Sequence, residues 1–148
     1  RVDDAVAATK AALAEGIVAG GGVTLVNLAG ELKVSGADSI AAGRQILKDA
    51  LKQPFLQIMR NAGLNADALL AQVEAGKAGF GVNVMKPENE LVDVKKAGVI
   101  DPARVTKEAV QNAVSIASTA ATMGALVVDV PEPEAPAAPG VMPGMGMM

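Results

Sequence analysis

The stretch RVDDAVAATKAALAEGIVAGGGV, residues 1–23, decides the fold because it joins a helix to a turn of three glycines. A stripe at helical spacing runs along its first part, formed by Val2, Val6, Thr9 and Leu13. Gly16 follows where such a helix would stop. Gly20, Gly21 and Gly22 then remove every Cβ where the backbone must pass close to another group, and a second helix opens directly afterwards with free N–H groups facing that space. Such a corner suits a bound nucleotide or a hinge.

The middle of the chain also shows mainly helical spacing. We expect three further helices, at about 22–32, 37–61 and 65–76. Pro54 removes one backbone donor and should bend the long helix, and the side chain of Asn65 should cap the third. Glycine-punctuated runs between 76 and 94 indicate a small hairpin or an irregular loop.

The end of the chain begins with a helix start signal. Asp101 is expected at the N-cap and Pro102 at the first helical position, where its missing N–H is not needed, and the helix should run to about Met123. Residues 126–130 are a candidate for a short strand, and the prolines, glycines and methionines of 131–148 predict a disordered tail. The predicted fold class is therefore mainly α, a multihelical bundle with a small β-hairpin and a short C-terminal strand.

Composition limits the chemistry that the chain can perform. Its 148 residues are 51% hydrophobic but only 1% aromatic, so one core of closely packed aliphatic side chains is expected. The absence of Cys and His excludes disulfides, thiol nucleophiles, the usual zinc sites and catalytic triads. Carboxylates, hydroxyls, Lys, Arg and backbone groups remain.

Charge and hydropathy indicate which partners to expect. The net charge of −3 and the 13 thinly spread basic residues argue against a nucleic-acid surface. Residues 109–128 carry no charge and could span a bilayer in length, but their polar side chains and lack of aromatic residues favour a buried helix of a soluble protein. No secretory leader is visible before the first helix, so we expect no membrane partner and a cytoplasmic location.

Several of these segments resemble one family. Residues 1–23 resemble the part of the group I chaperonins, the Hsp60/GroEL family, that leaves the intermediate domain and re-enters the equatorial domain. Residues 98–106 resemble the nucleotide-side loop and last long helix of that family, and the Gly/Met-rich end resembles its C-terminal tail. The resemblance implies that 1–15 end the intermediate-domain helix, 16–130 form the C-terminal half of an equatorial ATP-binding domain with its equatorial-like bundle, and 131–148 form a flexible tail.

The resemblance implies a catalytic role for Asp4. In the chaperonins the matching Asp swings onto the nucleotide and helps to position or activate the water that attacks the γ-phosphate. A carboxylate suits this role because it can accept a hydrogen bond from the water and orient it. Asp4 also lies in a first helical turn, where an acid is favourable for the helix dipole in any protein, and Asp3 would be structural or on the surface.

The resemblance implies nucleotide-binding roles for five further residues. Gly21 matches a glycine whose backbone contacts the nucleotide near its sugar, and Asp101 matches an acceptor for the ribose hydroxyls. Asn83, Val84 and Met85 occupy the adenine-edge segment, although Val84 and Met85 are larger than the alanines usual there. Without the resemblance, the glycine triplet is also explained by a tight turn between helices. A simple N-cap role is likewise sufficient to explain Asp101.

The implied function is that of an ATP-dependent chaperonin that assists protein folding in a ring. Implied partners are neighbouring subunits of a homo-oligomeric ring, a co-chaperonin, and unfolded protein clients held by an apical domain that is not in these residues. The phosphate loop and the Asp that holds most of the Mg²⁺ would also lie elsewhere, so we expect the chain alone not to hydrolyse ATP. Two alternatives stay open: a helical assembly module without independent nucleotide binding, and an unrelated Ala-rich scaffold without a ligand.

Overall fold

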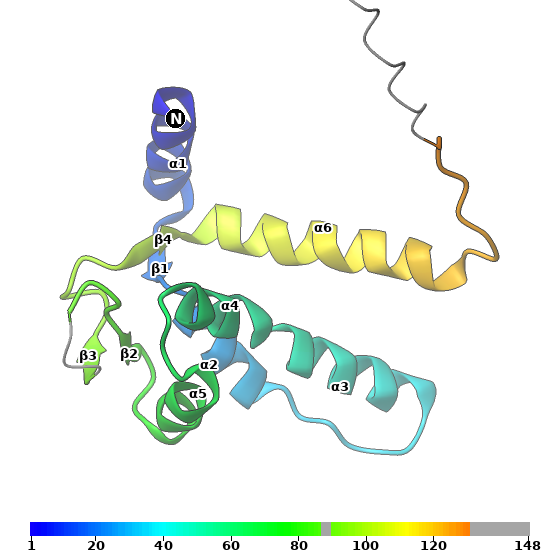
Figure 1. Cartoon of the computed structure of the whole chain (residues 1–148), viewed down its shortest axis with the longest axis horizontal. Coiled ribbons are helices and arrows are strands. Elements are labelled where there is room, and N and C mark those ends of the chain that lie inside the picture. Colours follow the sequence, from blue (N-terminus) through cyan, green and yellow to red (C-terminus); the bar gives the residue numbers. More distant parts are fainter. Residues whose placement is uncertain (87–89, 131–148) are drawn as a thin grey trace, which may run out of the picture.

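The computed structural model describes residues 1–86 and 90–130, and within them the chain is mainly helical with two small antiparallel strand pairs (Figure 1). The elements in chain order are α1 (Val2–Glu15), β1 (Ile17–Ala19), α2 (Val23–Glu31), α3 (Ser39–Ala50), α4 (Gln53–Asn61), α5 (Ala66–Ala75), β2 (Phe80–Val82), β3 (Leu91–Asp93), β4 (Ile100–Pro102) and α6 (Ala103–Thr122). The predicted mainly α class with a small hairpin is confirmed. The predicted tail lies outside the described residues.

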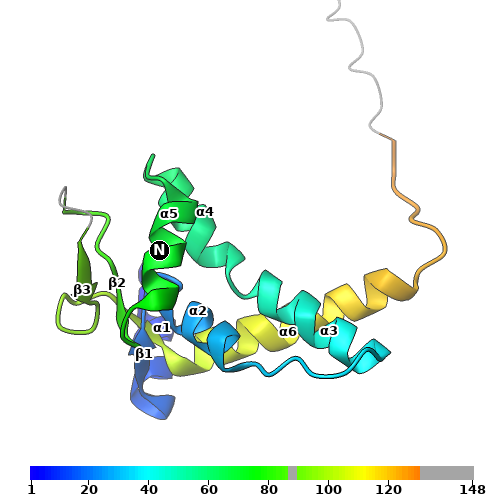
Figure 2. The ribbon, with the colours of Figure 1, turned by 90° about the horizontal axis from the view of Figure 1, so that it is seen from below.

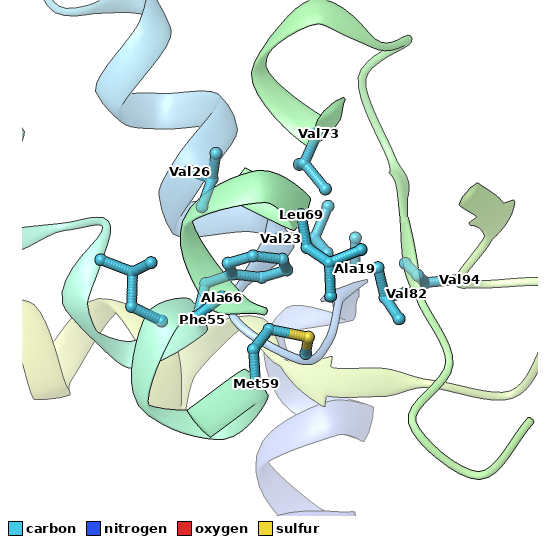
Figure 3. Packing of buried hydrophobic residues seen from close by; sticks show 11 residues of the cluster. Ala19, Val23, Val26, Phe55, Met59, Ala66, Leu69, Val73, Val82 and Val94 are labelled. Carbon is cyan, nitrogen blue, oxygen red and sulfur yellow. The ribbon is translucent and has the colours of Figure 1, made fainter. Parts of the chain in front are cut away.

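The core is one cluster of buried side chains around Phe55 (Figure 3). Phe55 of α4 is completely buried, and Val23 of α2, Met59 of α4 and Val73 of α5 are nearly so. Val94, at the end of the hairpin, closes the cluster with no exposed surface. One aliphatic core with a single aromatic side chain at its centre agrees with the prediction from composition, because the burial of apolar surface is what holds these short helices together.

The two strand pairs connect distant parts of the chain. β2 and β3 form the expected hairpin, in which Gly81 pairs with Val92. β1 pairs with β4, so Val18 lies opposite Asp101 and Ala19 opposite Ile100. The sequence reasoning missed this second pair, because three-residue strands are too short to show an alternating pattern.

The glycine turn follows β1 and is shaped by two close backbone contacts. A Cβ on Gly20 would lie 2.9 Å from the backbone nitrogen of Ile100, and a Cβ on Gly22 would lie 2.8 Å from the backbone nitrogen of Phe55. Gly21 and Gly22 both have positive φ angles, of 66° and 79°. The glycines therefore let the chain pass β4 on one side and α4 on the other before α2 starts.

The long helix predicted over 37–61 is two helices in the structure. α3 ends at Ala50 and α4 begins at Gln53, so the chain breaks before Pro54 rather than bending there. The reason is positional, since proline is tolerated in the first turn of a helix, and Pro54 lies in the first turn of α4. The prediction for Asn65 is confirmed, because its side chain accepts a 3.2 Å hydrogen bond from the amide of Ala68 at the start of α5.

The outer helices do not take part in the core. Neither α1 nor α6 has a buried residue, so the prediction that 109–128 are buried is wrong for this chain. The cause is the arrangement of the core, because α2, α4 and α5 pack on each other and leave α6 in contact with α1 and β4. Residues 126–130 form no strand, since no described segment pairs with them. In residues 1–86 and 90–130, no helix is long and apolar enough to cross a membrane.

The turn can be tested by adding one methyl group at each of its glycines. We expect Gly20→Ala and Gly22→Ala to lower the free energy of unfolding by about 1–3 kcal/mol, because backbone atoms must move away from the new Cβ. Gly21→Ala should cost about 1–2 kcal/mol, from its positive φ alone. Urea unfolding followed by circular dichroism measures all three.

Gly30→Ala on the exposed side of α2 is the matched control, because a Cβ there meets no atom within 4 Å. It should raise the free energy of unfolding by about 0.5–1 kcal/mol through its better helix propensity. Equal losses at positions 20, 21 and 30 would contradict this account of the turn.

Candidate functional site

Gly21 and Asp101 come together at the junction of β1, β4 and α2, which we call the glycine corner (residues 20–22 and 99–101). The amide of Gly20 donates a 3.0 Å hydrogen bond to the carbonyl oxygen of Val99, which continues the β1–β4 ladder into the turn. A Cβ built on Gly21 would lie 3.6 Å from Val99 Cγ1, and no other described atom outside its immediate chain neighbours would lie within 4 Å. Gly21 therefore lies against Val99, which precedes Asp101 by two residues, while Asp101 itself lies opposite Val18.

Asp101 belongs to β4 and does not cap α6, which corrects the sequence prediction. Pro102 is the N-cap residue, its ψ of 129° is extended, and the helix begins one residue later than expected, at Ala103. Pairing with Val18 keeps Asp101 extended, and an extended conformation is also the one that a following proline favours. Its carboxylate accepts no hydrogen bond from any described residue, and partial burial raises the pKa of this carboxyl from its ordinary value.

The adenine-edge segment predicted at Asn83 to Met85 forms a turn beyond the end of β2. Asn83 Oδ1 accepts a 3.0 Å hydrogen bond from the amide of Met85, and the carbonyl oxygen of Asn83 accepts one from the amide of Lys86 at the same distance. Met85 is 88% exposed and Val84 is 40% exposed. The side chain of Met85 is therefore directed largely into solvent, whereas that of Val84 is more than half covered, and the turn itself is built from Asn83 and backbone groups.

The hairpin is attached to the glycine corner through two contacts. Gly81 lies against the side chain of Val23, the first residue of α2, where no Cβ could fit. The amide of Val99 donates a 2.8 Å hydrogen bond to the carbonyl oxygen of Val94, just after β3. Asn83 follows Gly81 by two residues, so the structure brings the hairpin end to the same end of α2 as Gly21 and Asp101.

Asp4 is not brought to this corner. It is an exposed residue in the first turn of α1, twelve residues before Gly16, which corresponds to about 18 Å along the helix. Figure 1 shows α1 rising from β1 on the side away from α2, with the N-terminus at its far end. The structure therefore separates the predicted catalytic acid from the predicted nucleotide-binding residues.

The base of α1 is held to α6 by contacts that the sequence reasoning missed. The amide of Ala103 donates a 3.0 Å hydrogen bond to the carbonyl oxygen of Gly16, and Lys107 Nζ lies 2.6 Å from Glu15 Oε2. Arg104 lies in the same part of α6, and its pKa is raised from its ordinary value. The main cause is its 2.8 Å hydrogen bond to Glu108, and the negative charge of Glu15 adds to the effect. A local sequence pattern cannot predict these contacts between α1 and α6, because they join residues that are far apart in the sequence.

A large apolar groove opens on another face of the molecule. Figures 1 and 2 show α6 running past α3, and residues of α6, α3 and the start of α4 line an open hollow of about 670 Å³. An adjoining hollow of about 470 Å³ lies between α6 and α2, and the two share Leu25, Leu47, Leu51 and Val110. Neither is lined by Asp4, Gly21, Asn83 or Asp101. The groove and the glycine corner are thus separate features.

The described part of the chain brings no metal site to the corner. Among residues 1–86 and 90–130, no three acidic side chains lie close enough together to hold a metal ion. What the corner offers is a carboxylate with free acceptor capacity, a close-packed glycine turn and a helix start, a combination suited to a hydroxyl-bearing, anionic ligand.

The solved structures that are similar to this chain include two chaperonins. A crystal structure of a group III chaperonin in the open state matches with a TM-score of 0.69 and 27% identity, over 79% of this chain and 25% of that one. An open-state monomer of a group II chaperonin from Methanococcoides burtonii matches with a TM-score of 0.62 and 24% identity, over 72% of this chain and 28% of that one. This chain thus spans about a quarter of the length of either relative.

The family itself follows from a longer match. Residues 1–130 match the TCP-1/cpn60 chaperonin family, and this stretch includes the glycine corner, the hairpin and every helix described above. An unrelated helical scaffold is thereby excluded, and the chain belongs to the TCP-1/cpn60 chaperonin family.

Proposed function

We propose that this chain forms part of an ATP-driven chaperonin subunit of the group I type. In this proposal residues 1–15 end the intermediate-domain helix, 16–130 form the C-terminal half of the equatorial domain, and 131–148 form the tail. The observation that carries the proposal is the pairing of β1 with β4 in a chain of the chaperonin family, which places Asp101 opposite Val18 and leaves Gly21 against Val99, two residues before Asp101. The whole subunit would act in a homo-oligomeric ring in the cytoplasm, with a co-chaperonin and unfolded protein clients.

The glycine corner is the proposed nucleotide site. Asp101 would accept hydrogen bonds from the ribose hydroxyls, and its lack of any other donor among the described residues supports this role. Gly21 would let its backbone approach the sugar, since no side chain fills the open space beside it. Asn83, Val84 and Met85 would border the adenine through backbone groups, and the exposure of the Met85 side chain is compatible with this.

Asp4 would orient the attacking water after a movement of α1. The movement is required because Asp4 lies about 18 Å from Gly16 along the helix. Gly16 is a suitable pivot, with φ of 83° and ψ of −169°, a backbone conformation open essentially to glycine alone. No side chain of α1 is buried in the core, so the movement would have to loosen the contacts between α1 and α6, including the Lys107–Glu15 ion pair, but none within the core.

The chain alone should be inactive because the residues that would hold the phosphates and most of the Mg²⁺ lie outside it. A second candidate function, a helical assembly module without nucleotide binding of its own, is supported by the unburied faces of α1 and α6. The two differ in whether Asp101 contributes to binding a nucleotide.

Nucleotide binding tests Asp101. In a mixture of this chain with the complementary half-domain, Asp101→Ala should weaken binding of a non-hydrolysable ATP analogue by about 10–100-fold, the usual effect of losing hydrogen bonds to a charged group. The same variant should not weaken binding of the 2′,3′-dideoxy analogue, which lacks the hydroxyls. Isothermal titration calorimetry measures both, and Asp49→Ala, on the surface of α3, is the control. An equal loss for both analogues would show that Asp101 acts elsewhere than on the ribose.

Asp101 should also affect stability in a pH-dependent way. Because its pKa is raised in the folded chain, the folded state binds the proton more tightly, and this contribution to stability is present below the ordinary pKa of Asp and lost as pH rises through the raised value. Asp101→Asn should therefore be more stable than the parent at pH 7, with the difference shrinking as the pH is lowered toward 4. Urea unfolding at pH 4, 5, 6 and 7 measures the difference, and a constant difference would contradict the role of burial.

Hydrolysis tests Asp4. The chain alone should release no phosphate above background, and Asp4→Ala in the complete subunit should lower kcat by about a hundredfold or more without weakening nucleotide binding. Asp3→Ala, the neighbouring acid, is the matched control and should leave kcat unchanged. Loss of activity in both variants would point to the helix start rather than to the Asp4 carboxylate.

A further inference from the structure

The contact between α1 and α6 consists of small side chains and charged groups. Figure 1 shows the two helices diverging from the β1–β4 pair, so their contact lies near the base of α1. The partly covered side chains of α1 are Ala8, Ala11 and Ala12, and every other side chain of this helix is exposed. Each alanine contributes one methyl group, so the apolar surface that holds α1 to its neighbours is small. The orientation of α1 therefore depends largely on the polar contacts at its base.

These polar contacts include one backbone hydrogen bond and one ion pair. The carbonyl oxygen of Gly16 accepts from the amide of Ala103 at 3.0 Å, and Glu15 Oε2 lies 2.6 Å from Lys107 Nζ. The hydrogen bond fixes the point from which α1 leaves the strand pair, since both of its groups belong to the backbone. The ion pair acts on the last residue of α1 through a long side chain, so it bears on the direction in which the helix points.

A second cation lies near Glu15. Arg104 precedes Lys107 by three residues on α6, a spacing that makes their side chains neighbours on the helix surface. Glu108 is the main cause of the raised pKa of Arg104, and the charge of Glu15 adds to it, so Glu15 lies close enough to act on this guanidinium. Arg104 Nε donates a 2.8 Å hydrogen bond to Glu108 Oε1. Glu108 thus holds the cation that would otherwise compete for Glu15.

Exposure keeps the cost of exchanging partners low. The four charged side chains, those of Glu15, Arg104, Lys107 and Glu108, are between 38% and 53% exposed. Ion pairs at such positions stabilise weakly, because water solvates the separated charges well. Two pairings that differ little in free energy can both be populated, and their balance then responds to a change in one partner.

We propose that Glu15 is a two-position latch for α1: it binds Lys107 in the observed orientation and Arg104 in a second one, and Glu108 selects between them. In the second orientation Arg104 leaves Glu108, and the end of α1 turns about the Gly16–Ala103 hydrogen bond toward the start of α6. The core is not disturbed, because no side chain of α1 is buried.

The latch has a consequence for Asp4, at the other end of the helix, and this consequence rests on the proposed function. By setting the population of each orientation of α1, the latch would set how often the Asp4 carboxylate is carried toward the nucleotide.

Distances between spin labels on α1 and α6 test the exchange, because the chain has no cysteine of its own. Ala5→Cys and Asn112→Cys supply one labelling position on each helix, and both positions are exposed. Double electron–electron resonance on the full chain, without nucleotide, should give one main distance.

Three variants should change this distance in different ways. Lys107→Gln should replace it by a second defined distance, because Arg104 then binds Glu15. Glu108→Gln frees Arg104 and should raise the population of the second distance by about threefold or more, the effect expected from one exposed ion pair. Glu15→Gln removes the acid common to both pairings and should broaden the distribution.

Lys52→Gln is the matched control, since it breaks the 2.7 Å ion pair with Glu74, which joins other helices, and should leave the distance unchanged. An unchanged distribution in Glu15→Gln would overturn the latch, because the alanine face alone would then orient α1. Equal broadening in Lys107→Gln and Glu15→Gln would overturn it as well, since Arg104 would then be no alternative partner. No rise of the second distance in Glu108→Gln would overturn the selecting role of Glu108.

The measurement uses no nucleotide, so its outcome is separate from that of the proposed function. Partner exchange in a chain whose Asp101→Ala variant binds the ATP analogue as tightly as the parent would overturn only the nucleotide site. A fixed α1 in a chain that meets the Asp101 prediction would overturn only the latch.

Discussion

The structure depends on the close approach of the chain after β1 to the backbone of β4. Gly20 donates to Val99 at 3.0 Å, and its missing side chain is what allows the two backbones to meet. This contact positions the glycine turn, and the turn determines where α2 starts. The hairpin in turn packs against the start of α2, because Gly81 lies against the side chain of Val23. The close approach at Gly20, together with the β1–β4 pairing that it continues, thereby helps to position Gly21, Asp101 and the segment after β2.

Local signals in the sequence predicted what local interactions decide. Asn65 caps α5 with its own side chain three residues on, and the first helix ends at Gly16 as expected, because both events involve only neighbouring residues. Asp101 was predicted to be the N-cap of the last helix, but Pro102 is the N-cap and Asp101 belongs to β4. The extended backbone of Asp101 depends on its pairing with Val18, which is distant in the sequence. A register between two three-residue strands cannot be read from composition or spacing.

Burial was the least predictable property. The spacing along α6 correctly indicated a helix, but a pattern says only which face is apolar and not what covers it. The apolar faces of α2, α4 and α5 are covered by the core around Phe55, whereas no residue of α1 or α6 is buried. For the site, the glycine turn itself was visible in the sequence, whereas its neighbours and the attachment of Glu15 to Lys107 were not.

The backbone at Gly16 can act as a hinge for α1. Gly16 has no Cβ, its carbonyl oxygen accepts a hydrogen bond from the amide of Ala103, and Asp4 lies about 18 Å away along the helix. A rotation of about 30° at that residue would displace the far end by about 9 Å while hardly disturbing the core. Small torsional changes at one glycine can thus be amplified into travel across a site.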